Sequence, residues 1–405
     1  MRSMQRRRRK PEAAGSLTVG TCFNGRVRDI SADGKGVVPH ENGQVFFVAG
    51  VWLNEQVQVR INDFKGRFGF AELVTVTEPS PDRVEPPCPY QGVSARSCGG
   101  CPWQFVRYEA QLQVKQARVE QSFTGMIASG FLKSDRLKPI LPSPEIYAYR
   151  NRAQLKTDGE RLGYVTAGSR SLVDIKDCII LTDKNRETLR ALRMHLPNPA
   201  WRPRRKDYLT TLDIDESVGA DSASVNARLP FQQANSAQNQ AMRDWLSHKL
   251  SSLQKSQAVL ELFAGSGNFT SLIVDAGFTN IMAVEVVDEA MAELRHKYPQ
   301  VKTLACDLFS DDAAEAVYRA MPDAEILVLD PPRDGLKNDL LKSKQGLFRK
   351  KSRIKTLLYI SCNLATLHRD LQAFVEHGFK IREIQPLDQF PHTPHIELMA
   401  HLERS

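Results

Sequence analysis

The sequence lacks any apolar run close to the roughly 20 residues that cross a membrane, so we expect no membrane-spanning segment. The arginine run within residues 1–10 has no apolar stretch behind it and does not match a secretory signal. Cysteine is scarce, with 7 in 405 residues. An odd count without a signal argues against a disulfide framework. Together these absences predict a cytoplasmic protein.

Positive charge is in excess, because 55 Lys and Arg residues face 47 Asp and Glu residues and give a formal net charge of +8. Such a balance suits a polyanionic partner. We expect residues 1–15 to form a basic disordered tail, with a phosphate-binding arm as the alternative.

Residues 16–78 read as five short strands separated by turn signals such as Asn42-Gly43, which is typical of an OB-like β-barrel. Barrels of this type often bind RNA through basic and aromatic side chains, although most such side chains only face solvent. The candidates are Arg26, Arg28, Lys35, Lys65, Arg67, Phe64 and Phe68.

Residues 79–230 are expected to form a central, strand-rich α+β domain that contains a group of cysteines. Cys98 and Cys101 form a Cys-x-x-Cys pair, Cys88 lies upstream, and Cys178 is the nearest remaining candidate for a fourth ligand. Zinc sites usually pair two Cys-x-x-Cys units, so three close cysteines and a distant one favour a [4Fe-4S] cluster. Zinc and unmetallated structural cysteines remain alternatives. The stretch from Gln104 to Thr124, free of Gly and Pro, predicts a long helix.

Residues 231–405 change to an alternation of strands and helices, which predicts a largely parallel α/β sheet. Its opening strand, Val259-Leu-Glu-Leu262, runs into a turn that contains Gly265 and Gly267. A second acid, Glu285, follows at the distance at which a Rossmann acid meets a ribose hydroxyl. The turn is Gly-x-Gly rather than Gly-x-Gly-x-x-Gly, so S-adenosylmethionine fits better than a dinucleotide.

Chemistry-bearing residues follow the later strands. Asp330 begins an Asp-Pro-Pro-Arg loop, Cys362 ends the next strand, and Glu397 begins the last one. A thiolate that adds to uracil C6 makes C5 able to attack a methyl group, and a base must then remove the C5 proton. A buried structural cysteine and an ordinary edge carboxylate are the alternatives. The Asp-Pro-Pro loop also suggests an amino-group methyltransferase, although Arg333 stands where that loop carries an aromatic residue.

These motifs resemble the RNA (uracil-5-)-methyltransferase family, and most closely its branch that modifies 23S ribosomal RNA and carries an N-terminal TRAM domain. The resemblance implies a Rossmann-like S-adenosylmethionine-dependent methyltransferase domain, an N-terminal TRAM barrel and a central iron–sulfur domain. It implies that Cys362 is the nucleophile and Glu397 the proton acceptor. It also implies that the helix over residues 104–124 packs on the catalytic domain. The positions that match cofactor contacts are Gln233, Phe263, Asn268, Glu285, Asp307 and Asp330, and the cluster ligands are Cys88, Cys98, Cys101 and Cys178.

One departure from the family pattern is the long gap between Cys88 and Cys98, a loop insertion that should be tolerated because loop-closure entropy grows slowly with length. The expected substrate is 23S ribosomal RNA, with transfer RNA as the runner-up, and the expected state is a monomer. A noncatalytic RNA-binding assembly factor is the competing hypothesis from another class. The sequence does not identify the target uridine.

Overall fold

The computed structural model describes residues 17–227, 232–337, 340–341, 346–349 and 352–404. The basic tail predicted over residues 1–15 lies outside this part, as does Phe231 at the predicted domain boundary. Two compact units divide the chain, one ending at Arg83 and the other running from Val84 to Ser405. Within the described ranges, no helix is long and apolar enough to span a membrane.

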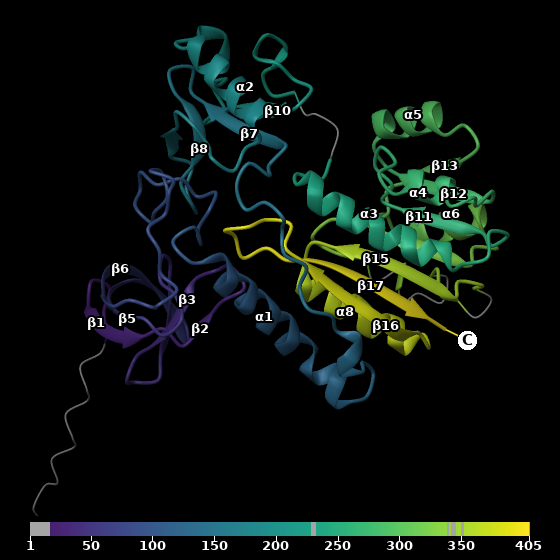
Figure 1. Cartoon of the computed structure of the whole chain (residues 1–405), viewed down its shortest axis with the longest axis horizontal. Helices are drawn as coiled ribbons and strands as arrows, with labels where there is room; N and C mark the ends of the chain where they lie inside the picture. Colours follow the sequence, from purple (N-terminus) through teal and green to yellow (C-terminus); the bar gives the residue numbers. More distant parts are fainter. Residues whose placement is uncertain (1–16, 228–231, 338–339, 342–345, 350–351, 405) are drawn as a thin grey trace, which may run out of the picture. The chain divides into compact units, whose positions relative to one another are not determined.

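The first unit is a six-stranded sheet in the order β1-β5-β6-β4-β3-β2. All its strand pairs are antiparallel except β4–β6, and β5 and β6 form a long hairpin that turns at Gly66, where φ is 64° (Figure 1). The sequence predicted five strands, and closure of the sheet into a barrel remains a prediction. The strands are β1 Cys22–Arg26, β2 Asp29–Ile30, β3 Gly36–Pro39, β4 Val45–Val48, β5 Gln56–Lys65 and β6 Phe68–Glu78.

The end of the first unit is fixed by Glu55, whose side chain is fully buried. Its carboxylate accepts hydrogen bonds from the Arg83 guanidinium and from the Trp52 backbone N–H. A buried carboxylate is costly unless it is paired in this way. The unit therefore extends past its last strand to Arg83.

The second unit begins with the cysteine-bearing loops, followed by helix α1 (Tyr108–Ala128) and a small antiparallel sheet in the order β10-β7-β8-β9. Leu155, Leu189 and Leu212 form the core between this sheet and α2. The sequence pattern found three of the four strands and missed β9 and α2. The elements are β7 Arg152–Thr157, β8 Leu162–Val165, β9 Leu172–Asp174, α2 Asp183–Met194 and β10 Thr210–Asp215.

The larger sheet of this unit has the strand order β13-β12-β11-β14-β15-β17-β16. The strands from β11 to β15 run parallel, and β17 is antiparallel to both of its neighbours. β11 lies between β12 and β14, so the strand order reverses there and opens a crevice at the strands' carboxyl ends. The strands are β11 Val259–Leu262, β12 Ile281–Glu285, β13 Lys302–Ala305, β14 Ile326–Leu329, β15 Thr356–Ser361, β16 Lys380–Leu387 and β17 Glu397–Glu403.

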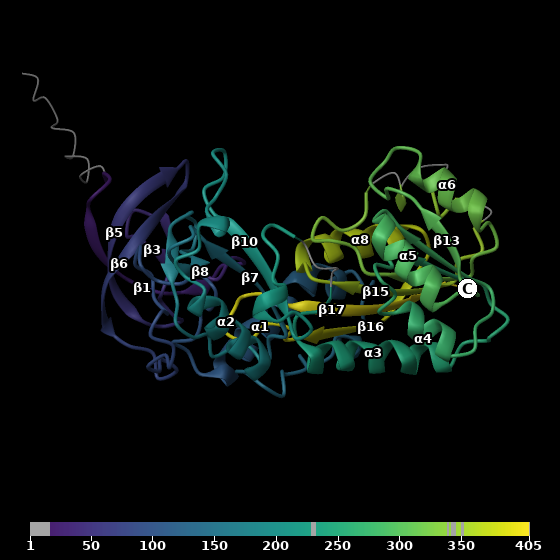
Figure 2. The same ribbon diagram turned by 90° about the horizontal axis from the view of Figure 1, so that it is seen from above.

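Helices cover both faces of this sheet, and Figure 2 shows α3 and α4 on one face and α8 on the other. Alternate residues of β11 enter different cores, since Val259 packs with α3 and α4 while Leu260 packs with α8. Phe123 of α1 belongs to the same core as α8, so α1 packs on this sheet. The helices are α3 Ser236–Ser251, α4 Thr270–Asp275, α5 Asp288–Lys297, α6 Ala313–Ala320 and α8 Leu364–Glu376.

Candidate active site and cysteine cavity

Strand register brings the predicted nucleophile and the predicted base to the same edge of the large sheet. Ser361 of β15 pairs with Leu398 of the antiparallel β17. Cys362 follows Ser361 and Glu397 precedes Leu398, so these two residues are neighbours across the ladder. Asp330 follows the last residue of β14, which pairs with β15 in parallel. Three predicted site residues therefore meet where three adjacent strands begin or end.

Burial makes this edge unfavourable for negative charge. Glu397 is 4% exposed, and burial, with a smaller contribution from Asp330, holds its pKa well above the ordinary range. Burial also raises the pKa of the Cys362 thiol to about 11, with Glu397 and Asp330 adding to the rise. The pKa of Asp330 rises to about 7 for the same reason. The proposed nucleophile must react as a thiolate, whereas this surrounding favours the thiol form.

Arg333 supplies the opposing charge, because its guanidinium lowers the pKa of both Cys362 and Glu397. Its backbone carbonyl accepts hydrogen bonds from Asn363 Nδ2 at 3.0 Å and from Thr366 Oγ1 at 3.1 Å. The first turn of α8 thus holds the Asp-Pro-Pro-Arg loop against the strand end that carries Cys362. Sequence reasoning treated Arg333 as part of a family motif and as a departure from another motif, and it missed this electrostatic role.

The glycine turn after β11 has the backbone that a close-fitting ligand loop requires. Phe263, Gly265 and Gly267 have positive φ values of 63°, 53° and 93°. A side chain at Gly265 would be strained there, and among the described residues no heavy atom lies within 4 Å of the position its Cβ would take. The buried Ser266 Oγ has no hydrogen-bond partner among the described residues. The turn therefore has open space at Gly265 and a buried, unsatisfied hydroxyl at the next residue.

Glu285 and Glu261 organise this turn from two adjacent strands. Glu285 accepts the Gly265 N–H at 3.0 Å and also the backbone N–H groups that follow it in the chain. Glu261 is buried, accepts the Thr270 hydroxyl at 2.6 Å, and has its pKa raised by burial to about 8. At neutral pH Glu261 is therefore mainly protonated and links β11 to the start of α4.

Of the remaining predicted cofactor residues, Asn268 belongs to this turn, Asp307 is linked to it through Phe309, and Gln233 contacts the loop before β17 instead. Asn268 exchanges two side-chain hydrogen bonds with Asn239 of α3. Gln233 accepts a hydrogen bond from Gln389 of the loop before β17, at 3.2 Å. Asp307 is exposed and accepts the Phe309 N–H, and the Phe309 ring contacts the Phe263 ring at a centroid distance of 5.9 Å.

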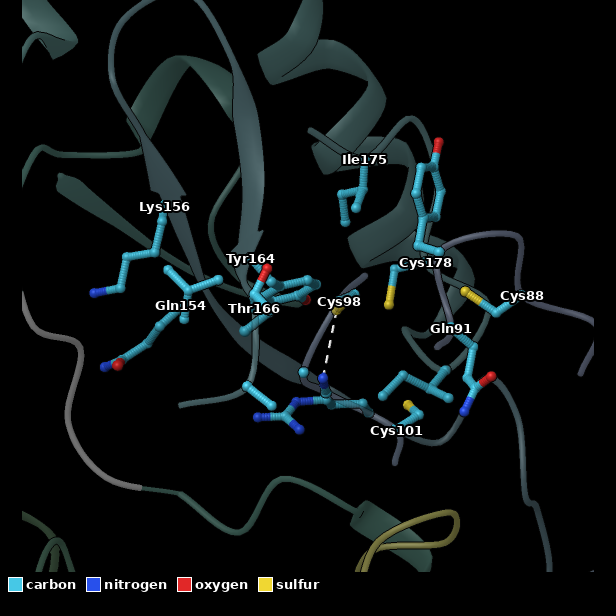
Figure 3. Close-up of a pocket in the computed structure, with 18 of the residues that line it drawn as sticks. Cys88, Gln91, Cys98, Cys101, Gln154, Lys156, Tyr164, Thr166, Ile175 and Cys178 are labelled. Atoms are coloured by element: carbon cyan, nitrogen blue, oxygen red, sulfur yellow. Dashed lines mark hydrogen bonds between the residues drawn. The ribbon is translucent and has the colours of Figure 1, made fainter. Parts of the chain in front are cut away.

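The four predicted ligand cysteines line one cavity of about 1000 Å³, and Figure 3 shows their side chains around its centre. Burial raises the pKa of Cys101, which the other three thiols raise further, and it raises the pKa of Cys178 to about 11. In the described part of the chain, no three His, Cys, Asp or Glu residues form a group that could hold a metal ion. The long gap after Cys88 folds into local turns that return to Cys98, whose N–H donates to the Tyr90 carbonyl at 2.7 Å.

A buried polar network that sequence reasoning missed joins α1 to the loop over residues 388–396. Lys115 and Asp388 form a fully buried ion pair, and Gln111 binds His392. Lys115 and Gln111 are four residues apart and therefore share one helix face. Two polar residues at this spacing on a buried helix face were the sequence signal that could have predicted this network.

The fold and the strand-end site define the chain as an α/β methyltransferase. The crystal structure of a Pyrococcus abyssi tRNA (uracil-54, C5)-methyltransferase with S-adenosyl-L-homocysteine superposes with a TM-score of 0.67 at 22% identity, covering 94% of this chain and 99% of that chain. A family model described as tRNA (uracil-5-)-methyltransferase matches residues 317–405, which contain Asp330, Cys362 and Glu397.

Sequence relatives extend over almost the whole chain. An uncharacterized RNA methyltransferase of Nitrosomonas europaea is 40% identical, over 93% of this chain and 96% of the relative. The 23S rRNA (uracil(1939)-C(5))-methyltransferase RlmD of Pectobacterium atrosepticum is 29% identical, over 97% of this chain and 94% of the relative. The chain therefore belongs to the RNA (uracil-5-)-methyltransferase family, and it is an enzyme of the RNA methyltransferase class.

Proposed function

We propose that this protein transfers a methyl group from S-adenosylmethionine to carbon 5 of a uridine in RNA, with Cys362 as nucleophile and Glu397 as base. The observation that carries the proposal is the cross-strand proximity of these two residues at the ends of β15 and β17. Sulfur and carboxyl groups in such proximity can act on adjacent ring carbons of one pyrimidine.

The reaction begins when the Cys362 thiolate forms a bond to C6 and the C5=C6 electron pair moves into an enolate. C5 then attacks the methyl group of the sulfonium cosubstrate, and the cosubstrate's sulfur leaves as a neutral thioether. The Glu397 carboxylate takes the C5 proton, the C5=C6 bond re-forms, and the C6–S bond breaks to release the thiolate. The charge of Arg333 partly offsets the burial that disfavours both reactive anions.

Cosubstrate binding is proposed at the glycine turn. Among the described residues, open space lies at the Cβ position of Gly265, and the Ser266 hydroxyl has no hydrogen-bond partner. Both features fit a ligand that contacts the backbone closely. Glu285 ends β12 at the position where an acid meets a ribose hydroxyl. The related Pyrococcus abyssi structure holds S-adenosyl-L-homocysteine, which supports this choice.

We also propose that Cys88, Cys98, Cys101 and Cys178 hold a [4Fe-4S] cluster. The chemistry of the donors suits such a cluster, because four free thiols line one cavity and three of them are disfavoured as isolated anions. In the described part of the chain, however, no three of them form a group that could hold a metal ion, so binding requires the thiols to move closer together. Bound as thiolates, they would tie three separate loops to one inorganic centre. No step of methyl transfer requires that centre to change its oxidation state. Brown protein with broad visible absorption and stoichiometric iron supports the cluster, and colourless protein with stoichiometric zinc contradicts it.

The proposed substrate is 23S ribosomal RNA, with transfer RNA as the second candidate. The relatives named RlmD support the first, whereas the family model and the superposed crystal structure carry transfer RNA in their descriptions. A uracil paired within a duplex hides C5 and C6, so the target must lie in a loop or be flipped out at a cost of a few kcal/mol.

Tritium release tests the function. The protein is incubated with S-adenosylmethionine and with 23S rRNA or tRNA transcripts labelled with tritium at uridine C5. The proposal predicts release of one tritium for each methyl group transferred. Methylation without release indicates an amino-group methyltransferase, and binding without methylation indicates a noncatalytic factor. The transcript that supports turnover identifies the substrate.

A further inference from the structure

The loop over residues 388–396 connects β16 to β17 and ends beside Glu397, the first residue of β17. Its backbone is bound by side chains of α1 and by a backbone N–H of the segment before that helix. Lys115 Nζ donates to the Phe390 carbonyl at 3.2 Å, and Arg118 Nη1 donates to the Pro394 carbonyl at 2.8 Å. Helix α1 therefore helps to hold this loop in place, together with Tyr149, Asn235 and Gln238, whose side chains also donate to its carbonyls.

Lys115 makes the most costly of these contacts. Its side chain and that of Asp388 are both fully buried, and Nζ lies 2.5 Å from Asp388 Oδ1. The other carboxylate oxygen, Oδ2, has no hydrogen-bond partner among the described residues. Buried ion pairs often add nothing to stability relative to apolar residues of similar volume, because both charges lose their hydration. A role in fixing geometry is therefore the better explanation for this pair.

Gln111 fixes the loop at its most constrained residue. His392 is buried and has a left-handed backbone with φ of 66°. Its N–H donates to Gln111 Oε1 at 2.8 Å, and its carbonyl accepts the Trp103 N–H at 3.0 Å. The His392 ring stacks on Tyr147 and lies 3.2 Å from Gln111 Nε2. Both backbone polar groups of His392 are thus held from the segment that contains α1.

We propose that Gln111 and Lys115 are positioning residues that aim the Glu397 carboxylate at the C5 proton of the methylated uridine. This inference rests on the proposed function and adds residues outside the catalytic sheet to it. A base must lie within hydrogen-bond reach of the proton it removes. A displacement of about 1 Å costs about 100-fold in rate. Because proton removal is the last step, a misplaced Glu397 slows release of the product after the methyl group has been transferred.

The test follows the covalent intermediate in the full-length protein with tritiated 23S rRNA or tRNA transcript, whichever supports turnover. Gln111→Leu and Lys115→Met are expected to slow tritium release by about tenfold or more and to accumulate a protein–RNA adduct that resists denaturation. Gln113→Leu is the matched control, because Gln113 is exposed on the same helix. It should retain wild-type release and show no accumulated adduct.

A double variant separates positioning from folding. Lys115→Met with Asp388→Leu removes both buried charges and should recover the melting temperature lost in Lys115→Met. We expect it to keep slow release and adduct accumulation. The positioning role is overturned if the folded variants turn over slowly without accumulating adduct. It is also overturned if the double variant recovers wild-type turnover together with the wild-type melting temperature. Glu397→Gln is run alongside: if wild-type protein is active and this variant forms no adduct, the proposed role of Glu397 fails, and the positioning role falls with it.

Discussion

The catalytic sheet edge and the cysteine cavity both gather groups that are disfavoured as isolated anions, but they do so by different means. At the sheet edge, Asp330, Cys362 and Glu397 are aligned by strand register. In the cavity, loops and a distant segment bring four cysteines together. Ladder hydrogen bonds persist when a strand-end side chain is replaced, whereas the proposed cluster would depend on the thiols themselves. Substitutions should therefore affect chemistry at the first region and integrity at the second.

The largest expected effect is the loss of activity in Cys362→Ser. A serine hydroxyl is a far weaker nucleophile, so tritium release should fall by about 10⁴-fold or more. The melting temperature should change little, because the strand ladder does not involve the sulfur. Cys22→Ser, at an exposed position in the first unit, is the control and should match wild type. Activity in Cys362→Ser near that of the control removes this cysteine from the mechanism.

Cys101→Ser should have the opposite effect to Cys362→Ser, with a large loss of stability and a smaller loss of activity. Loss of one proposed ligand is expected to abolish the visible absorption and bound iron, and to lower the free energy of unfolding by more than about 2 kcal/mol. Iron content, absorption spectra and thermal melts measure these effects. Trp103, two residues later, binds the His392 carbonyl, so a smaller loss of activity should follow. Retention of full iron and stability would mean that Cys101 is not a ligand.

The pH dependence of catalysis tests the groups at the sheet edge and not those in the cysteine cavity. In the proposed mechanism Cys362 and Glu397 both react as anions, and both have raised pKa values. The value of kcat/KM should therefore increase by about tenfold or more between about pH 7 and about pH 9. The two groups interact, so the apparent pKa values belong to the pair. A flat profile from a chemistry-limited reaction contradicts the assignment of these protonation states.

The smallest effect concerns Glu261. Its folded pKa of about 8 lies above its ordinary value, so the unfolded chain loses the proton first as pH rises. Its contribution to stability is therefore complete at low pH and is lost between about pH 4.5 and about pH 8. Glu261→Gln keeps a neutral side chain of similar shape. Urea unfolding should find this variant gaining stability relative to wild type as pH rises through that window. If the difference in unfolding free energy between the variant and wild type does not change with pH, Glu261 titrates normally.

Local sequence patterns predicted the parts of the site that depend on a single strand and its turn. The strand predicted to end at Cys362 is confirmed as β15, which ends one residue earlier at Ser361. The predicted acids, glycines and cysteine follow the expected strands, because apolar runs and turn residues are encoded locally. The helix predicted from Gln104 begins instead at Tyr108, since the backbone before it turns to meet His392.

Features that depend on long-range packing could not be predicted. β16 lies at the sheet edge and includes Pro386, which weakens its strand pattern and is tolerated only at such edges. The contacts of Lys115 and Gln111 with residues 388–392 join segments more than 270 positions apart. The raised pKa of Cys362 is likewise a property of the packed strand ends.

Mapping the covalent adduct of Glu397→Gln is the most direct test of the mechanism. The variant is incubated with S-adenosylmethionine and unlabelled transcript, digested with nuclease and protease, and analysed by tandem mass spectrometry. The account predicts a methylated uridine attached through C6 to the peptide that contains Cys362. An active wild-type enzyme whose variant carries no adduct, or carries it on another residue, contradicts the account.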